Sequence, residues 1–241
     1  MCAYDVELAW LSGMLHDVGR FEQIKRYNTF SDADSVDHAR FGADLLFKDG
    51  LISTFLKGMV KCTGYKPGAL EDRYGSDGVF LYNKLNKSDM EMLELAIRCH
   101  NMYRIPQGLN RREQAFCNVL RDADKVDIFK VNIDTPLEEI YNTTTEELMK
   151  SDITDEVLEA FGEEHCILKA IRRTPADTVI GHVSLAYELV YDESVRITVE
   201  QGYLGKLMHF HSDNEETNRK MAMVREKMDS HVKKRIGKKD A

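Results

Sequence analysis

Apolar residues recur at helical spacing along most of the chain, and this periodicity is the feature that most constrains the fold. Leu8, Leu11 and Leu15 share one face of a helix expected over residues 6–18. Similar patterns predict helices over residues 36–47, 88–100 and 110–129. Alternating patterns typical of strands are rare, and only four prolines interrupt the chain. We therefore predict an all-α fold with about ten helices or more and little or no sheet.

The sequence also predicts a core domain followed by a helical extension. The residues that could carry chemistry end near residue 133. Beyond that point we expect further helices, with residues 195–210 as either helix or short strand and a break at Thr174-Pro175. We assign residues 1–133 to the core and residues 134–241 to an extension packed on it.

Charge and composition exclude several classes of partner. The net charge of −8 argues against nucleic acid and anionic lipid, both of which need a basic surface. No apolar run approaches the roughly eighteen residues of a membrane span, and no signal peptide is recognisable. The five cysteines are scattered without a Cys-x-x-Cys pair, as in proteins with reduced thiols. We expect a cytoplasmic protein without a membrane partner, and a homo-oligomer is compatible with the sequence.

The dipeptide His16-Asp17 most constrains the chemistry. It offers a neutral nitrogen ligand beside a carboxylate that can reach two metals at once. Adjacent helical residues point about 100° apart, so both can bind one centre only where the helix is ending. Gly19 predicts such an ending, because glycine tolerates the left-handed conformation that closes a helix. An isolated His-Asp pair, however, is more often a buried histidine beside an exposed aspartate.

Three later positions, His38, His100 and Asp124, offer matching chemistry on separate helices. His38 lies one turn before Gly42, a small residue that would let another helix approach closely. His100 follows an apolar helical face and should point inward with it. Asp124 lies in an apolar stripe, where a carboxylate is costly unless it binds metal or pairs, for example with Lys125. Each residue alone has a structural explanation, but together they point to a metal centre.

The segments around these positions resemble the HD superfamily of metal-dependent phosphohydrolases, in the pattern of its two-metal branch. The matching segments are residues 11–20, 37–45, 96–101 and 121–127. The resemblance covers about residues 5–130 and implies an HD-domain helical bundle.

The resemblance also implies a ligand set. His16, Asp17 and Asp124 would hold one metal, and Asp17 would bridge to a second metal held by His38 and His100. Mixed imidazole and carboxylate ligands suit iron, manganese, nickel, cobalt or zinc better than magnesium alone.

The chain departs from the family pattern in one respect. The family carries its first histidine ligand well upstream of the His-Asp pair, and none of the fifteen residues before His16 is histidine. Either an N-terminal helix is missing, which is what we expect, or the protein has lost this ligand. The first metal would then keep three protein ligands, and apolar groups of the following helix, including Trp10 or Leu11, would be exposed.

The implied reaction is hydrolysis of a phosphate ester or anhydride by a metal-bound hydroxide. A small phosphorylated substrate, with nucleotides as the leading class, would be the partner. Asp17 would act in catalysis, and Arg20 and Lys125 would hold substrate phosphate or, equally, form ion pairs with buried carboxylates. The Gly-Tyr-Pro signature of the branch that hydrolyses cyclic dinucleotides is only half matched by residues 64–67.

Two other interpretations stay open. The first is a noncatalytic module, in which an incomplete HD site binds a nucleotide or metal. The second is a mononuclear enzyme in which His38 and His100 contact the substrate. Metal occupancy would favour an enzyme, whereas carboxylates paired with Arg20 and Lys125 would favour the module.

Overall fold

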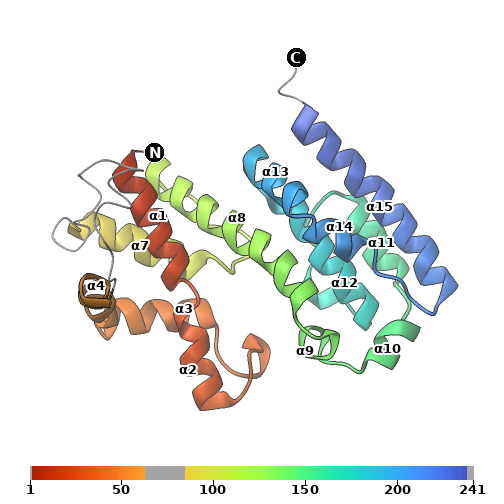
Figure 1. Cartoon of the computed structure of the whole chain (residues 1–241), viewed down its shortest axis with the longest axis horizontal. Coiled ribbons are helices and arrows are strands. Elements are labelled where there is room, and N and C mark those ends of the chain that lie inside the picture. The colour runs from red at the N-terminus through yellow and green to blue at the C-terminus, as the bar shows by residue number, and fades with distance from the viewer. Residues whose placement is uncertain (1, 63–84, 238–241) are drawn as a thin grey trace. The chain divides into compact units, whose positions relative to one another are not determined.

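The computed structural model describes residues 2–62 and 85–237, and every regular element in these ranges is helical (Figure 1). Thirteen α-helices and the absence of strands from the described residues confirm the all-α class. No helix in the described ranges is long and apolar enough to cross a membrane. The half-match to the Gly-Tyr-Pro signature at residues 64–67 lies outside the described residues.

The chain divides into two compact units, Met1–Arg121 and Asp122–Ala241. The division lies within the helix Arg111–Asp134, upstream of the domain boundary expected after residue 133. That expected boundary stays a prediction. The helices of the first unit are α1 (Ala3–Leu15), α2 (Val18–Tyr27), α3 (His38–Ala43), α4 (Leu51–Cys62), α7 (Lys87–Cys99) and the start of α8 (Arg111–Asp134). A π-helical segment, Asp44–Lys48, continues α3. The core of this unit includes Leu8, Leu11, Leu46, Leu93, Ile97 and Phe116.

Several helices begin at residues other than those expected. The first predicted helix, over residues 6–18, is shifted by three residues, because α1 spans Ala3–Leu15. Helix α3 begins at His38, two residues after the predicted start at residue 36, and Asp37 caps it by accepting from the Arg40 backbone NH at 3.1 Å. Helix α7 begins at Lys87, one residue before the predicted start at residue 88, and Asn86 caps it. The side-chain oxygens of Asp and Asn are at least as effective as that of serine in capping a helix start. Asp37 lies inside the range predicted as helix and Asn86 lies before the next one, so neither start follows the apolar periodicity.

The helices α2 and α3 touch through two glycines. A Cβ on Gly19 would lie 2.2 Å from the His38 carbonyl oxygen and 2.7 Å from the Gly42 nitrogen. A Cβ on Gly42 would lie 2.9 Å from the Gly19 nitrogen. The close approach expected at Gly42 is therefore confirmed. The role expected for Gly19 is wrong: it lies inside α2 without a left-handed conformation, and backbone contact is what requires a glycine there.

A buried carboxylate joins α1, α7 and α8 within the first unit. Asp89, 1% exposed, accepts hydrogen bonds from the Tyr4 hydroxyl and from Arg112 Nη1, both at 2.7 Å. Arg112 also pairs with Asp5 at 2.9 Å. Burial raises the pKa of the Asp89 carboxyl, but these bonds outweigh burial and hold the pKa below its usual range. The network fixes the helix that ends at His100.

We expect Asp89→Ala to destabilise the first unit by about 3 kcal/mol, because it strips a buried carboxylate from Arg112. Since the folded pKa of Asp89 is depressed, its contribution is present above the unfolded pKa of ~3.9 and is lost as pH falls through the folded value. Urea unfolding followed by the fluorescence of Trp10, the only tryptophan, measures this at pH 7 and pH 3. The difference from wild type should shrink at the lower pH. Glu91→Ala, at an exposed position on the same helix, should change stability by less than about 0.5 kcal/mol at both pH values; a similar loss there would contradict the assignment.

The outer face of α1 is apolar. Val6, Trp10 and Met14 lie one turn apart and are exposed, Trp10 at 55%. Leu11 is 1% exposed and belongs to the core. The expected exposure is thus confirmed for Trp10 and wrong for Leu11, because Leu11 lies on the face that packs inward.

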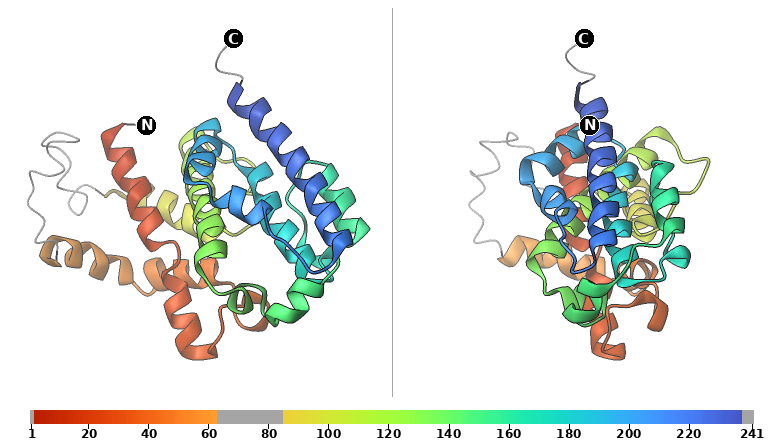
Figure 2. Two further views of the ribbon diagram at one scale, coloured as in Figure 1. Left: turned by 45° about the vertical axis from the view of Figure 1, so that its right-hand side comes forward. Right: turned by 90° about the vertical axis from the view of Figure 1, so that its right-hand side faces the viewer.

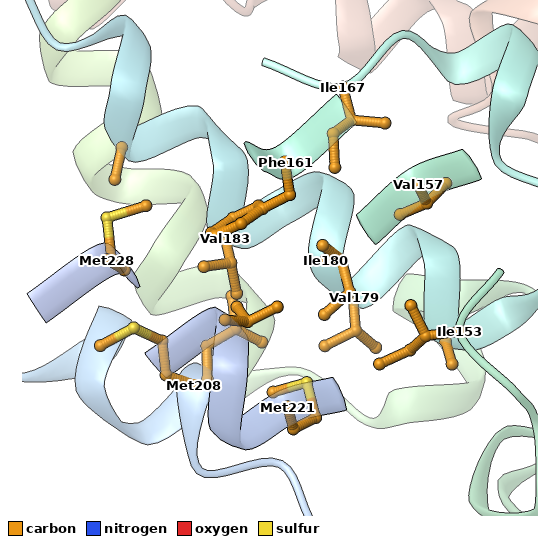
Figure 3. Packing of buried hydrophobic residues seen from close by; sticks show 14 of the residues in the cluster. Ile153, Val157, Phe161, Ile167, Val179, Ile180, Val183, Met208, Met221 and Met228 are labelled. Carbon is orange, nitrogen blue, oxygen red and sulfur yellow. The ribbon is translucent and has the colours of Figure 1, made fainter. Parts of the chain in front are cut away.

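The second unit has its own apolar core, part of which Figure 3 shows around Phe161, Ile180 and Met221. Its helices are the remainder of α8, α9 (Leu137–Tyr141), α10 (Thr145–Lys150), α11 (Asp155–Gly162), α12 (Pro175–Val183), α13 (Asp192–Gln201), α14 (Tyr203–Met208) and α15 (Glu215–Ile236). The long α15 packs along α11 and α13 (Figure 2). Residues 195–210, open between helix and strand, form no strand: residues 195–201 belong to α13 and residues 203–208 to α14. Thr174-Pro175 starts α12, since Thr174 caps it and Pro175 occupies its first turn.

Candidate metal centre

Four of the five predicted ligands meet in the first unit, each at a helix end. His16 and Asp17 form the turn between α1 and α2, where His16 caps α1 and Asp17 precedes α2. His38 is the first residue of α3, and His100 is the residue that ends α7. The turn lets two adjacent side chains face one region, which the middle of a helix would prevent. The Gly19–Gly42 contact then brings the start of α3 against this turn.

The nitrogen and oxygen atoms of the group lie within a few ångströms of one another. The Nε2 atoms of His38 and His100 are 3.1 Å apart. Asp17 Oδ1 lies 3.3 Å from His38 Nε2 and 3.6 Å from His100 Nε2. His16 Nε2 lies 3.7 Å from Asp17 Oδ2. The donor atoms of Asp17, His38 and His100 all lie within 4.8 Å of one another, a spacing that one ion can bridge.

The other nitrogen of each imidazole ring already faces a hydrogen-bond acceptor. His16 Nδ1 lies 2.7 Å from the Gly13 carbonyl oxygen, and His100 Nδ1 lies 2.7 Å from the Ile97 carbonyl oxygen. His38 Nδ1 lies 2.7 Å from an oxygen of Asp32. Because these acceptors hold no proton, each neutral ring carries its proton on Nδ1 and keeps its lone pair on Nε2. This is the arrangement in which protein histidines bind metals.

The lone pairs of Asp17 Oδ1, His38 Nε2 and His100 Nε2 converge, and this arrangement fits a cation. The buried Asp17 Oδ1 accepts no hydrogen bond from any described residue. The facing Nε2 atoms of His38 and His100 cannot bond to each other while both rings are neutral, because neither has a proton to donate. Electron-rich atoms so close together repel unless a positive charge lies between them. One divalent ion would satisfy all three.

The pKa shifts point in the same direction. Burial raises the pKa of the Asp17 carboxyl, but hydrogen bonds from protonated imidazoles at His100 and His38 outweigh burial and hold the pKa well below its usual range. Burial lowers the pKa of His38, but Asp17 and Asp32 outweigh it and raise the pKa. The site thus stabilises the negative charge of the Asp17 carboxylate and favours a positive charge beside it.

Asp32 is a site residue that the sequence did not single out. It lies in a 3-10 turn, Asp32–Asp34, between the helices predicted over residues 6–18 and 36–47. Burial raises its pKa, but the bond to His38 and further contacts lower it to about 2, so its carboxyl is ionised. A metal-binding histidine usually has a carboxylate or carbonyl at its second nitrogen. The sequence signal for Asp32 is its proximity to His38, but Asp34 and Asp37 also lie within six residues of that histidine.

Arg20 is engaged with carboxylates. Its Nη1 lies 3.2 Å from Asp32 Oδ1 and donates to the Phe30 carbonyl at 2.6 Å. Its Nε lies 3.7 Å from Asp17 Oδ1. Two roles were expected for Arg20, and the structure contains the contacts of one of them, the pairing with carboxylates.

The two remaining predicted residues belong to the second unit. Asp124 is half-buried and Lys125 is buried, both on α8. Their roles as metal ligand and phosphate-binding group stay predictions.

Comparisons of the chain with family models, with curated proteins and with solved structures find no match. The chemistry of the site has to be argued from its own side chains.

Proposed function

We propose that the protein is a metal-dependent phosphohydrolase that cleaves a phosphate ester or anhydride. The observation that carries the proposal is the convergence of Asp17 Oδ1 with two Nε2 lone pairs, each on a ring whose Nδ1 faces an acceptor. Imidazole with carboxylate is a ligand set for iron, manganese, nickel, cobalt or zinc. The sequence resemblance to HD phosphohydrolases supplies the reaction class.

The residues divide the work as follows. His38 and His100 would offer their Nε2 atoms to one cation, and Asp17 would offer Oδ1 to the same cation. His16 lies on the Oδ2 side of Asp17, where a second cation would share that carboxylate, with Asp124 as its predicted third ligand. Bound divalent cations supply hydroxide at neutral pH and neutralise the charge that develops on a phosphoryl group. No serine or cysteine nucleophile is required.

The substrate class rests on the resemblance alone. Two-metal HD proteins with this pattern act on nucleotides, and we propose a small phosphorylated molecule of that kind. The net charge of −8 disfavours long polyanions such as nucleic acid, which need an extended basic surface.

A second candidate function is a noncatalytic module that binds a nucleotide or a metal. The observation that favours it is the contact of Arg20 with both Asp17 and Asp32, since a guanidinium can neutralise a carboxylate in place of a metal ion. The Nε to Asp17 Oδ1 separation of 3.7 Å is long for a hydrogen bond, so Arg20 leaves that oxygen unsatisfied.

Metal analysis of the purified protein, combined with a panel of phosphate esters and nucleotides, tests the proposal. We expect one or two transition-metal ions per chain and phosphatase activity that a chelator removes and the metal restores. His38→Ala should lose one of two metals and retain part of the other, because His38 would hold only the second. Protein that stays metal-free and inactive after incubation with manganese, iron and zinc would favour the noncatalytic module.

A further inference from the structure

The three histidines of the site obtain their Nδ1 acceptors in two different ways. His16 and His100 lie at the ends of helices, and each uses the carbonyl three residues earlier in its own helix, that of Gly13 or Ile97. His38 is the first residue of α3, so the residue three positions before it lies outside the helix. No carbonyl of its own helix is available to it. A side chain has to supply the acceptor.

Asp32 supplies that acceptor with both of its oxygens. His38 Nδ1 lies 2.7 Å from Oδ2 and 2.9 Å from Oδ1. An ionised carboxylate only accepts hydrogen bonds, so this contact requires the proton on Nδ1. With the proton there, the Nε2 lone pair is directed at Asp17 Oδ1 and at His100 Nε2.

Asp32 is itself held by side chains from α2. Its Oδ1 accepts from Gln23 Nε2 at 3.0 Å and lies 3.2 Å from Arg20 Nη1. Gln23 is completely buried, and its Nε2 also lies 2.9 Å from Ser35 Oγ and 3.0 Å from the Val36 carbonyl oxygen, so its two amide protons are shared among three acceptors. A wholly buried amide with its bonds made fixes the loop before α3. The Asp32 carboxylate therefore meets His38 from a fixed direction.

We infer that Asp32 is a positioning residue, which holds neutral His38 in the Nδ1–H form with Nε2 ready to bind metal, and that Gln23 and Arg20 hold Asp32. The metal part of this inference rests on the proposed function. The tautomer part does not, because it concerns the ring of His38 in the metal-free protein. In this role Arg20 acts through Asp32 and does not have to contact substrate.

Nitrogen-15 spectra of histidine-labelled, metal-free protein, recorded at alkaline pH where the rings are neutral, report the tautomer of His38. We expect the Nδ1–H form in the wild type. In Asp32→Ala the proton should move largely to Nε2, as in histidine that lacks an acceptor at Nδ1. Asp32→Asn keeps an acceptor oxygen and should restore the Nδ1–H form. Asp34→Ala, at an exposed position in the same turn, is the matched control and should leave the spectrum unchanged.

Calorimetric titration with zinc gives the second measurement. We expect Asp32→Ala to weaken binding about 10–100-fold, as is typical for loss of the outer partner of a metal ligand, and Asp34→Ala to leave it unchanged. An unchanged His38 tautomer in Asp32→Ala, or zinc affinity within about twofold of wild type, overturns the inference. If the wild type binds no zinc, the proposed function fails separately, and the tautomer alone decides the role of Asp32.

Discussion

Replacing Asp17 with alanine is expected to abolish metal binding and phosphatase activity together. The two oxygens of its carboxylate face different histidines, Oδ1 toward His38 and His100 and Oδ2 toward His16. We expect metal affinity to fall by more than the roughly 10–100-fold that follows loss of an outer contact. Activity should fall to background, because substrate phosphate would lose the cations that neutralise it.

The substitution is a clean test because Asp17 does little for the fold itself. Its side chain is 46% exposed, and it precedes α2 without making a side-chain capping bond. Stability of the metal-free protein should therefore change by about 1 kcal/mol or less. Asp49→Ala, at an exposed position in the same unit, is the control and should keep full metal content. Metal stoichiometry measured by atomic emission that is equal in wild type and Asp17→Ala would refute the site.

Among the described glycines of the first unit, Gly19 should be the one at which alanine is most damaging. The new Cβ would lie 2.2 Å from the His38 carbonyl oxygen, and backbone cannot yield as a flexible side chain can. Relief requires α3 to move away from α2, which displaces His38 from Asp17. We expect a loss of about 3 kcal/mol or more, at the upper end for overpacking, together with weaker metal binding.

Gly13→Ala provides the matched control on a neighbouring helix. No atom lies within 4 Å of the Cβ that it would add, and Gly13 lies within α1. Alanine there should stabilise the protein by about 0.5–1 kcal/mol, since it lowers the entropy of the unfolded chain. Urea unfolding followed by Trp10 fluorescence distinguishes the two variants. Equal stability of Gly19→Ala and wild type would show that the two helices do not pack through these glycines.

Local patterns in the sequence determined the fold class and the identity of four clustered side chains. Helical periodicity placed Leu8, Leu11 and Leu15 on one buried face, because side chains three and four residues apart lie together on any helix. The pairing of histidine with aspartate indicated metal chemistry from residue type alone. Helix starts were less well predicted, since a cap such as Asn86 lies outside the apolar pattern that reveals the helix.

Contacts between residues distant in the chain were decided only by the tertiary structure. His38 and His100 lie 62 residues apart in sequence and 3.1 Å apart at Nε2, and no local propensity encodes that distance. The turn before His38 offers several carboxylates, and packing selected Asp32 by placing Gln23 and Arg20 beside it. The sequence identified Gly19 as a position that needs glycine, but it did not give the correct reason. A glycine can serve a left-handed turn or a close helix contact, and only the position of its neighbours distinguishes the two.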